Sequence, residues 1–164
     1  MNNTLQLLSR PSSSSLPAFR EAATRAIFYT LRCIPPNSPA GSKALPLINA
    51  SLTTFLFTRK LSLHADAFKY IFAHFPHLTR QLLPTVLAGI AGARSDFRKM
   101  DAAIMVEDVK LNEENPGGTA EAWEKAQRSL EELGRGAKRS TTKGKRMKRA
   151  IRIVSRLTQE RRGL

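Results

Sequence analysis

The sequence has only one cysteine, Cys33, among its 164 residues. A single thiol excludes an intramolecular disulfide and a zinc site built on cysteines, and it fits a reducing compartment. Long uncharged runs are also missing, because the two longest, residues 44–58 and 81–93, contain 15 and 13 residues. A helix that spans a bilayer needs about 20 apolar residues, so the sequence predicts no transmembrane segment.

The sequence also lacks the motifs of a catalytic or cofactor-binding site. It has no Gly-rich loop with a lysine to hold phosphates, and Cys33 has no companion that would activate it as a nucleophile. Three histidines, His64, His74 and His77, lie close together, but Pro76 prevents the last two from sharing an uninterrupted helix face. We therefore predict a protein that is not an enzyme, with no catalytic residue, no metal site and no cofactor.

Acidic residues are scarce outside one zone, and charge divides the chain into three parts. Residues 1–95 carry ten basic residues and two acids, residues 96–134 carry five and ten, and residues 135–164 carry twelve and one. The last part, here called the basic segment, holds +11 of the formal net charge of +14. Distinct charge blocks indicate distinct roles. One hypothesis is that the acidic zone folds back on the basic segment when no ligand is present.

Residues 1–42 are expected to form a flexible, basic N-terminal region with one amphipathic helix at residues 16–33. Pro35 and Pro36 end this helix. An N-terminus that is rich in Arg and Ser and poor in acids is also typical of an organelle transit peptide. The alternative is a basic arm that precedes the domain. N-terminal sequencing of the mature protein would distinguish the two, because an import signal would be cleaved near residues 33–42.

Helical periodicity of the apolar residues predicts an all-α fold, a small helical bundle with its core at about residues 43–109 and flexible basic extensions at both ends. The most convincing buried stripe contains Phe68, Ile71, Phe72 and Phe75, which recur at helical spacing. No alternating pattern argues persuasively for a strand. The four helices expected in the core cover residues 44–61, 64–75, 77–93 and 96–109.

Three details of these helices are open to test. Thr53 and Thr54 in the first would also suit a strand, because they are β-branched. Pro84 is expected to kink or split the third. In the fourth, Ser95 is the expected N-cap, and the expected apolar positions are Phe97, Met100 and Ile104.

Residues 110–134 are expected to form an acidic linker and a helix. Gly117 and Gly118 close the linker, and Thr119 caps the helix, whose apolar positions include Trp123. Gly134 is placed to end it. The helix is too short for an independent coiled coil, but it can dock on the core or on another chain. We therefore expect a protein partner or self-association through the core and the Trp123 helix.

The basic segment contains a predicted amphipathic helix at residues 145–158. Its apolar residues return every three or four positions and include Met147, Val154 and Leu157, while Lys and Arg fill the remaining circumference. Helix formation is expected to require the ligand or the domain to cover this apolar stripe. So dense a basic patch favours nucleic acid as the partner. The predicted nucleic-acid-binding residues are Arg135, Lys138, Arg139, Lys143, Lys145, Arg146, Lys148, Arg149, Arg152, Arg156, Arg161 and Arg162.

No aromatic residue follows Trp123. A basic amphipathic helix also serves anionic membrane surfaces or acidic proteins, but the lack of large apolar anchors favours nucleic acid over the membrane. The same lack removes base stacking by the basic segment, so contacts should be mainly to phosphates and weakly sequence-selective. Arg outnumbers Lys from residue 146 onward, which favours RNA over DNA.

Two biological settings fit these features. One is a viral accessory or nucleocapsid-type protein, and the other is an organellar ribosome-associated protein with a cleaved import signal. A structural adaptor with a solubilising basic segment is the third alternative. Residues 145–149 match a nuclear-import signal, which favours the cytoplasm or nucleus, with the mitochondrion or another organelle as the alternative.

Overall fold

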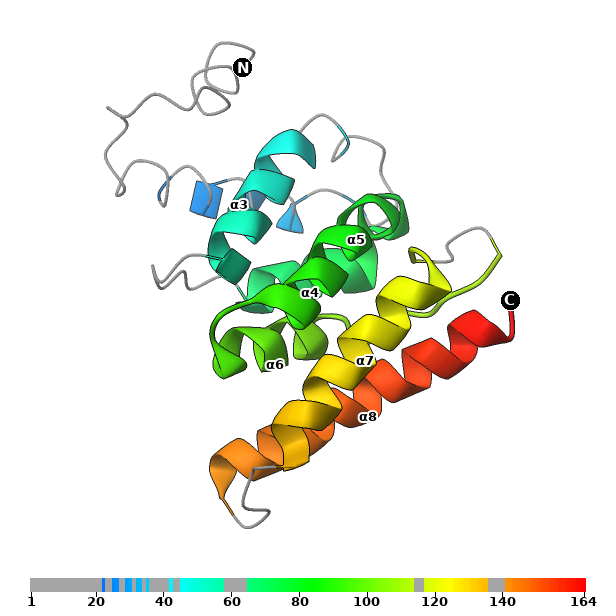
Figure 1. The fold of residues 1–164 in the computed structure, drawn as a ribbon. Helices are drawn as coiled ribbons and strands as arrows, with labels where there is room; N and C mark the ends of the chain where they lie inside the picture. Colours follow the sequence, from blue (N-terminus) through cyan, green and yellow to red (C-terminus); the bar gives the residue numbers. More distant parts are fainter. Residues whose placement is uncertain are drawn as a thin grey trace.

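A computed structural model of the protein describes residues 22, 25–26, 29–30, 32–33, 35, 42, 45–57, 65–113, 117–135 and 141–164. Within these residues the chain forms helices joined by turns and loops, with no strand, so the prediction of an all-α protein is confirmed. The helices labelled in Figure 1 are α3 (Leu45–Phe57), α4 (Ala65–His74), α5 (Pro76–Gly92), α6 (Asp96–Met105), α7 (Ala120–Arg135) and α8 (Thr142–Arg162).

The four helices expected in the core occur as α3 to α6. The α3 segment is helical despite its β-branched residues, and the Thr53 hydroxyl donates a 2.9 Å hydrogen bond to the Asn49 carbonyl one turn earlier. Pro84 does not split α5, which runs from Pro76 to Gly92 with this proline exposed to solvent. Proline has no N–H to donate to the carbonyl four residues earlier, that of Arg80, but the helix continues on both sides of Pro84.

Most of the expected N-terminal region, residues 1–42, lies outside the described residues. Those described at 22, 25–26, 29–30 and 32 are helical, within the helix expected at residues 16–33. The Arg32 guanidinium lies 5.4 Å from the ring centroid of Tyr70, which places Arg32 beside α4.

The predicted aromatic stripe of α4 forms part of the core. Phe68, Ile71 and Phe75 are each 0% exposed and Phe72 is 4% exposed. The ring centroid of Phe68 lies 6.0 Å from that of Phe55 on α3. Burial of three large aromatic side chains within about two turns gives this end of the bundle a large share of its apolar stabilisation.

The core extends beyond the residues expected to form it. Helices α7 and α8 lie side by side and antiparallel at one end of the molecule (Figure 1). Trp123 and Leu130 of α7, and Val154 and Leu157 of α8, belong to the same buried cluster as the α4 aromatics. Residues 142–162 are therefore a helix of the bundle rather than a flexible extension, because neighbouring helices cover the apolar stripe that the sequence predicted.

Gly134 does not end α7, which continues to Arg135. A Cβ atom on this glycine would lie 2.8 Å from the Ile151 Cδ1 atom of α8. The glycine therefore allows close approach of two helices rather than a left-handed helix end. Among the helices described, none combines the length and the apolar character that crossing a membrane requires.

Candidate nucleic-acid interface

Helix α8 confirms the amphipathic helix expected in the basic segment, with both ends extended by a turn or less. It begins where the Thr141 hydroxyl accepts a 3.0 Å hydrogen bond from the Gly144 amide. Met147, Ala150 and Leu157 are buried on its inner side, so the basic side chains project from the other sides. The bundle therefore fixes the direction in which each cation points.

Helices α6 and α8 form a row of ion pairs along their contact. The Lys143 ammonium lies 2.8 Å from an Asp96 carboxylate oxygen, and Arg146 pairs with Asp101. Farther along α8, Arg149 forms a bidentate pair with Glu107, in the turn after α6. The partners occur in the same order on both segments, so α6 and α8 run in the same direction.

Three more basic residues hold the C-terminal half of α8 to the bundle. Arg156 donates to the backbone carbonyls of Glu107 and Val109, at 2.7 and 3.2 Å. Arg161 Nε donates to the carbonyl of Gly118 at 3.1 Å. Arg162 pairs with Glu124 of α7 at 2.9 Å. These cations fasten α8 to the 107–109 turn and to the start of α7.

Glu107 is the centre of the largest of these clusters. Its carboxylate accepts from Arg149 and from Lys69 of α4, whose ammonium lies 3.1 Å away. These hydrogen bonds, Arg149 first, lower the pKa of Glu107 from its ordinary value near 4.5 to about 2. The hydrogen bond to Glu107 likewise raises the pKa of Lys69. The carboxylate is therefore ionised at neutral pH and joins α4, α6 and α8.

The remaining cations of α8 form one exposed stripe. Lys145, Lys148 and Arg152 are exposed, and no described residue pairs with any of the three. Their spacing of three and four residues places them on one side of the helix, and they span about 10.5 Å of its length. We call these three residues the exposed basic stripe.

Arg135, at the end of α7, lies alongside the first half of α8. It is exposed and has no partner among the described residues. Gly134 next to it lies against Ile151, in the middle of α8. Lys138 and Arg139, which were also predicted to bind nucleic acid, fall in residues 136–140, outside the described part of the chain.

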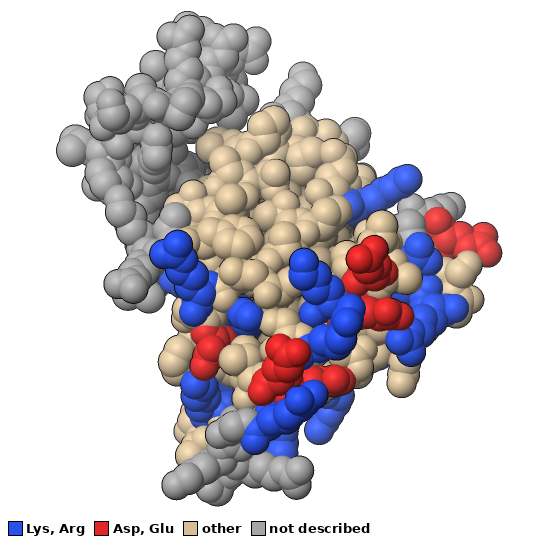
Figure 2. Space-filling model, viewed as in Figure 1, with Lys and Arg blue, Asp and Glu red and all other residues tan. Residues whose placement is uncertain are grey.

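Charge is unevenly distributed over the molecule. On the face shown in Figure 2, Lys, Arg, Asp and Glu are mixed over the region of α6, α7 and α8, whereas the visible surface of α3 to α5 has few charges. Helix α3 has no charged residue at all. The acidic zone therefore contacts the basic segment and neutralises part of it. That a ligand releases these contacts stays a prediction.

The structure thus divides the predicted binding residues into two sets. Six of the ten described are held by carboxylates or backbone carbonyls, and four are exposed without such a partner. The exposed four are Arg135, Lys145, Lys148 and Arg152; the held six are Lys143, Arg146, Arg149, Arg156, Arg161 and Arg162.

The run at residues 145–149 that matches an import signal lies inside α8. Met147 in its middle is 2% exposed, and two of its arginines are ion-paired with α6 and the turn after it. A receptor that reads these residues as an extended peptide would have to unwind the first turns of α8.

Elsewhere, a groove of about 750 Å³ lies between the α4–α5 junction and residues 108–112. Its described lining includes His77, Arg80, Lys110 and one carboxylate, Asp108, which lies 3.4 Å from the Lys69 ammonium. Paired carboxylates are not available from this lining. Among the described side chains, no group of three or more His, Cys, Asp or Glu is placed to hold a metal ion, and His64 lies outside them.

No family model, curated protein or solved structure matches this chain.

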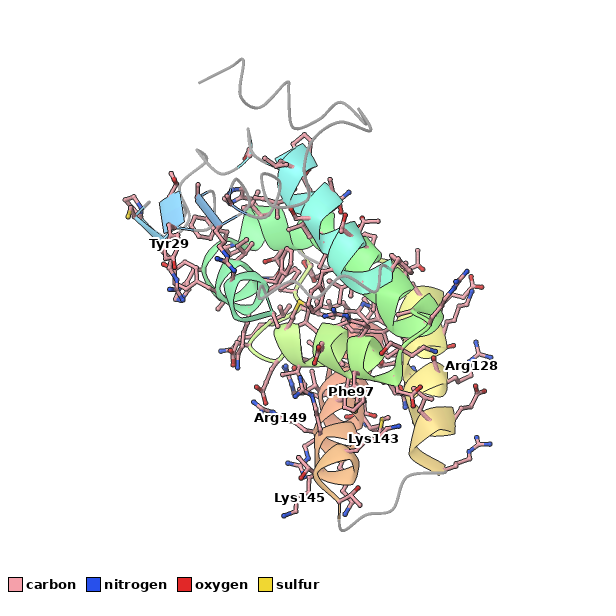
Figure 3. The ribbon with its side chains drawn as sticks, turned by 90° about the vertical axis from the view of Figure 1, so that its left-hand side faces the viewer. Tyr29, Phe97, Arg128, Lys143, Lys145 and Arg149 are labelled. Carbon is pink, nitrogen blue, oxygen red and sulfur yellow. The ribbon has the colours of Figure 1, made fainter. Side chains whose placement is uncertain are left out.

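One aromatic residue that the sequence pattern assigned to the core, Phe97, lies instead at the surface of this interface. Phe97 of α6 is 56% exposed, and the Lys143 ammonium lies 5.7 Å from its ring centroid. Figure 3 shows Phe97 beside Lys143, next to the end of α8 that carries Lys145. The spacing of Phe97 to Met100 and Ile104 suggested one apolar face, but only Met100 of the three is fully buried.

Proposed function

We propose that this protein is a non-enzymatic nucleic-acid-binding protein, with RNA favoured over DNA, that contacts phosphates through the exposed basic stripe. The observation that carries the proposal is the set of three exposed cations on one side of α8 that pair with no carboxylate in the described part of the chain. Such cations can neutralise phosphates without first breaking an ion pair. Arg135 adds a fourth cation beside them, and Lys138 and Arg139 follow it in the sequence.

The six held cations have a different role in this proposal. They hold α8 on the bundle and so give the exposed stripe a fixed direction, but they contribute little to phosphate binding. This distinction can be measured, because the salt dependence of affinity counts the phosphates that are neutralised. For a single strand, four contacts predict a slope of log affinity against log salt of roughly −3, whereas twelve would predict roughly −8.

The test is a salt titration of binding to a short labelled single-stranded RNA, measured by fluorescence anisotropy. The double variant Lys148→Gln/Arg152→Gln removes two stripe cations, and Lys110→Gln/Arg80→Gln removes the same residue types from the groove beside α5. Both control residues are exposed, and no described residue pairs with them. We expect the stripe variant to bind more weakly, with a slope that is smaller by roughly 1.4, and the control to keep the slope.

Two outcomes would overturn the proposal. Equal weakening by both variants would mean that RNA responds only to net charge. Full affinity in the stripe variant would move the site elsewhere, for example to Arg20, Arg25 and Arg32 of the N-terminal region.

Deletion of the basic segment would be a poor substitute for these variants. Without α8, the buried cluster loses Met147, Val154 and Leu157. A chain that ends at residue 134 would therefore lose binding through unfolding as well as through loss of cations. Substitution of exposed residues separates the two effects.

A further inference from the structure

Phe97 is an unusual residue for the surface of α6. Its side chain is 56% exposed although phenylalanine is among the residues most often buried, and it sits in the first turn of a ten-residue helix. Single exposed apolar residues are common, so exposure alone indicates no role. What distinguishes Phe97 is its setting at the end of α8 where the basic stripe begins.

Phe97 lies beside the cationic start of α8. Residues 143–146 hold three cations, Lys143, Lys145 and Arg146. The Lys143 ammonium lies over the Phe97 ring, and Lys145, two residues further along α8 and so on another side of that helix, is the first member of the exposed basic stripe. An exposed aromatic face near phosphate-binding cations is an arrangement by which proteins hold single-stranded nucleic acid, because every base has a π-face that can stack.

We propose that Phe97 is a base-stacking platform at the edge of the phosphate-binding surface, so that the protein selects nucleic acid with unpaired bases. This inference rests on the proposed function and adds its substrate class. An unpaired base can stack on the exposed ring, whereas bases stacked inside a duplex offer no free face. The basic segment has no aromatic residue of its own, and the neighbouring helix α6 supplies one.

Lys143 occupies the ring in the free protein and would have to move when a base arrives. Its side chain is 45% exposed, and its contacts are an exposed ion pair with Asp96 and an exposed cation–π contact. Both kinds of contact are weaker than stacking of a base on an aromatic ring. The base therefore displaces the ammonium from the ring.

The experiment compares a labelled single-stranded RNA with a duplex of the same sequence, for the full chain and two variants. Phe97→Leu keeps an apolar side chain but removes the π-face, and Phe97→Trp keeps the face. We expect Phe97→Leu to weaken single-strand binding by roughly 5- to 150-fold, the range for one stacked base, and to leave duplex binding nearly unchanged. Phe97→Trp should keep its affinity, and RNA should quench the fluorescence that it adds to that of buried Trp123.

Unchanged single-strand affinity in Phe97→Leu, or equal weakening for strand and duplex, would overturn this inference. The stripe variant Lys148→Gln/Arg152→Gln keeps that failure separate from failure of the proposed function. If it weakens binding to both RNAs while Phe97→Leu changes neither, phosphate binding stands and stacking does not. If the unaltered protein binds neither RNA, both proposals fall. Circular dichroism of each variant checks that the helices are intact.

Discussion

Arg156 donates a 2.7 Å hydrogen bond to the backbone carbonyl of Glu107, 49 residues earlier in the chain. The same guanidinium group donates to the Val109 carbonyl and pairs with Glu160 on its own helix. These bonds join the middle of α8 to the turn that follows α6. The basic segment is consequently part of the architecture at this point, and only the cations that face away from the turn are available to a ligand.

Arg152 and Arg156 lie one turn apart on α8, and substitution by glutamine should affect stability at the second position much more than at the first. We expect Arg156→Gln to lower the free energy of unfolding by about 1–2 kcal/mol, because it leaves two backbone carbonyls without their charged donor. Arg152→Gln, at an exposed position with no described partner, should change it by less than about 0.5 kcal/mol. Urea denaturation measures both.

The effects of the two substitutions on RNA affinity should be in the reverse order. Arg152→Gln weakens it, whereas Arg156→Gln leaves it unchanged under conditions where that variant is folded. Equal effects of the two substitutions on stability, or a larger effect of Arg156→Gln on affinity, would contradict the division of the basic segment into held and exposed cations.

Glu107 should make the protein sensitive to acid. Its pKa of about 2 in the folded state lies below the ordinary value near 4.5, chiefly because Arg149 and Lys69 donate hydrogen bonds to it. A lowered carboxyl pKa contributes stability that is fully present above about pH 4.5 and is lost as the pH falls toward 2. We expect Glu107→Gln to destabilise the protein by about 1–2 kcal/mol at pH 7, since partial exposure screens the interaction.

The difference in unfolding free energy between the unaltered protein and Glu107→Gln should shrink as the pH falls. Urea denaturation of the unaltered protein and of Glu107→Gln should give unfolding free energies that converge between pH 4.5 and 2. Glu113→Gln is the control, because Glu113 is exposed in the following loop without a described partner, and it should match the unaltered protein at every pH. A difference for Glu107→Gln that does not depend on pH would show that the lost contacts are not those of an ionised carboxylate.

The sequence was sufficient to predict the helices. Apolar spacing placed α3 to α8 within a few residues of where they lie, and it identified Phe68, Phe72 and Phe75 as core residues. Local periodicity determines which face of a helix is covered, and this is why the predictions succeed. It does not determine what covers the face, so α8 was expected to extend from the core instead of completing it.

The candidate site was less predictable, because its pattern of charges depends on tertiary contacts. The acids at 96, 101 and 107 match the cations at 143, 146 and 149 only because α6 and α8 lie alongside each other in the same direction. The charge zones suggested contact between the acidic and basic parts, but not which cations would stay exposed. Phe97 was expected in the core for a similar reason. Periodicity identifies the apolar face of a helix, but not how far along the helix its neighbours cover that face.

Gly117 provides a test of how the start of α7 is fixed. Its φ of 67° lies in the left-handed region, and its carbonyl accepts a 3.0 Å hydrogen bond from the indole of buried Trp123. A Cβ atom here would lie 2.7 Å from Leu111 Cδ2 and 3.0 Å from Leu83 Cδ1. We expect Gly117→Ala to destabilise the protein by about 2 kcal/mol, from backbone strain and the displacement of these side chains.

The matched control is Gly92→Ala at the end of α5, where a Cβ atom would meet nothing within 4 Å. This substitution should leave stability unchanged or raise it by about 0.5–1 kcal/mol, because alanine restricts the unfolded chain more than glycine does. Thermal or urea denaturation, followed by the fluorescence of Trp123, measures both variants. In Gly117→Ala the emission of the folded protein should also shift to longer wavelength as water reaches the indole. Equal stabilities for the two variants would mean that residue 117 can leave the left-handed conformation without disturbing Trp123, and that the tight turn before α7 does not hold this helix on the core.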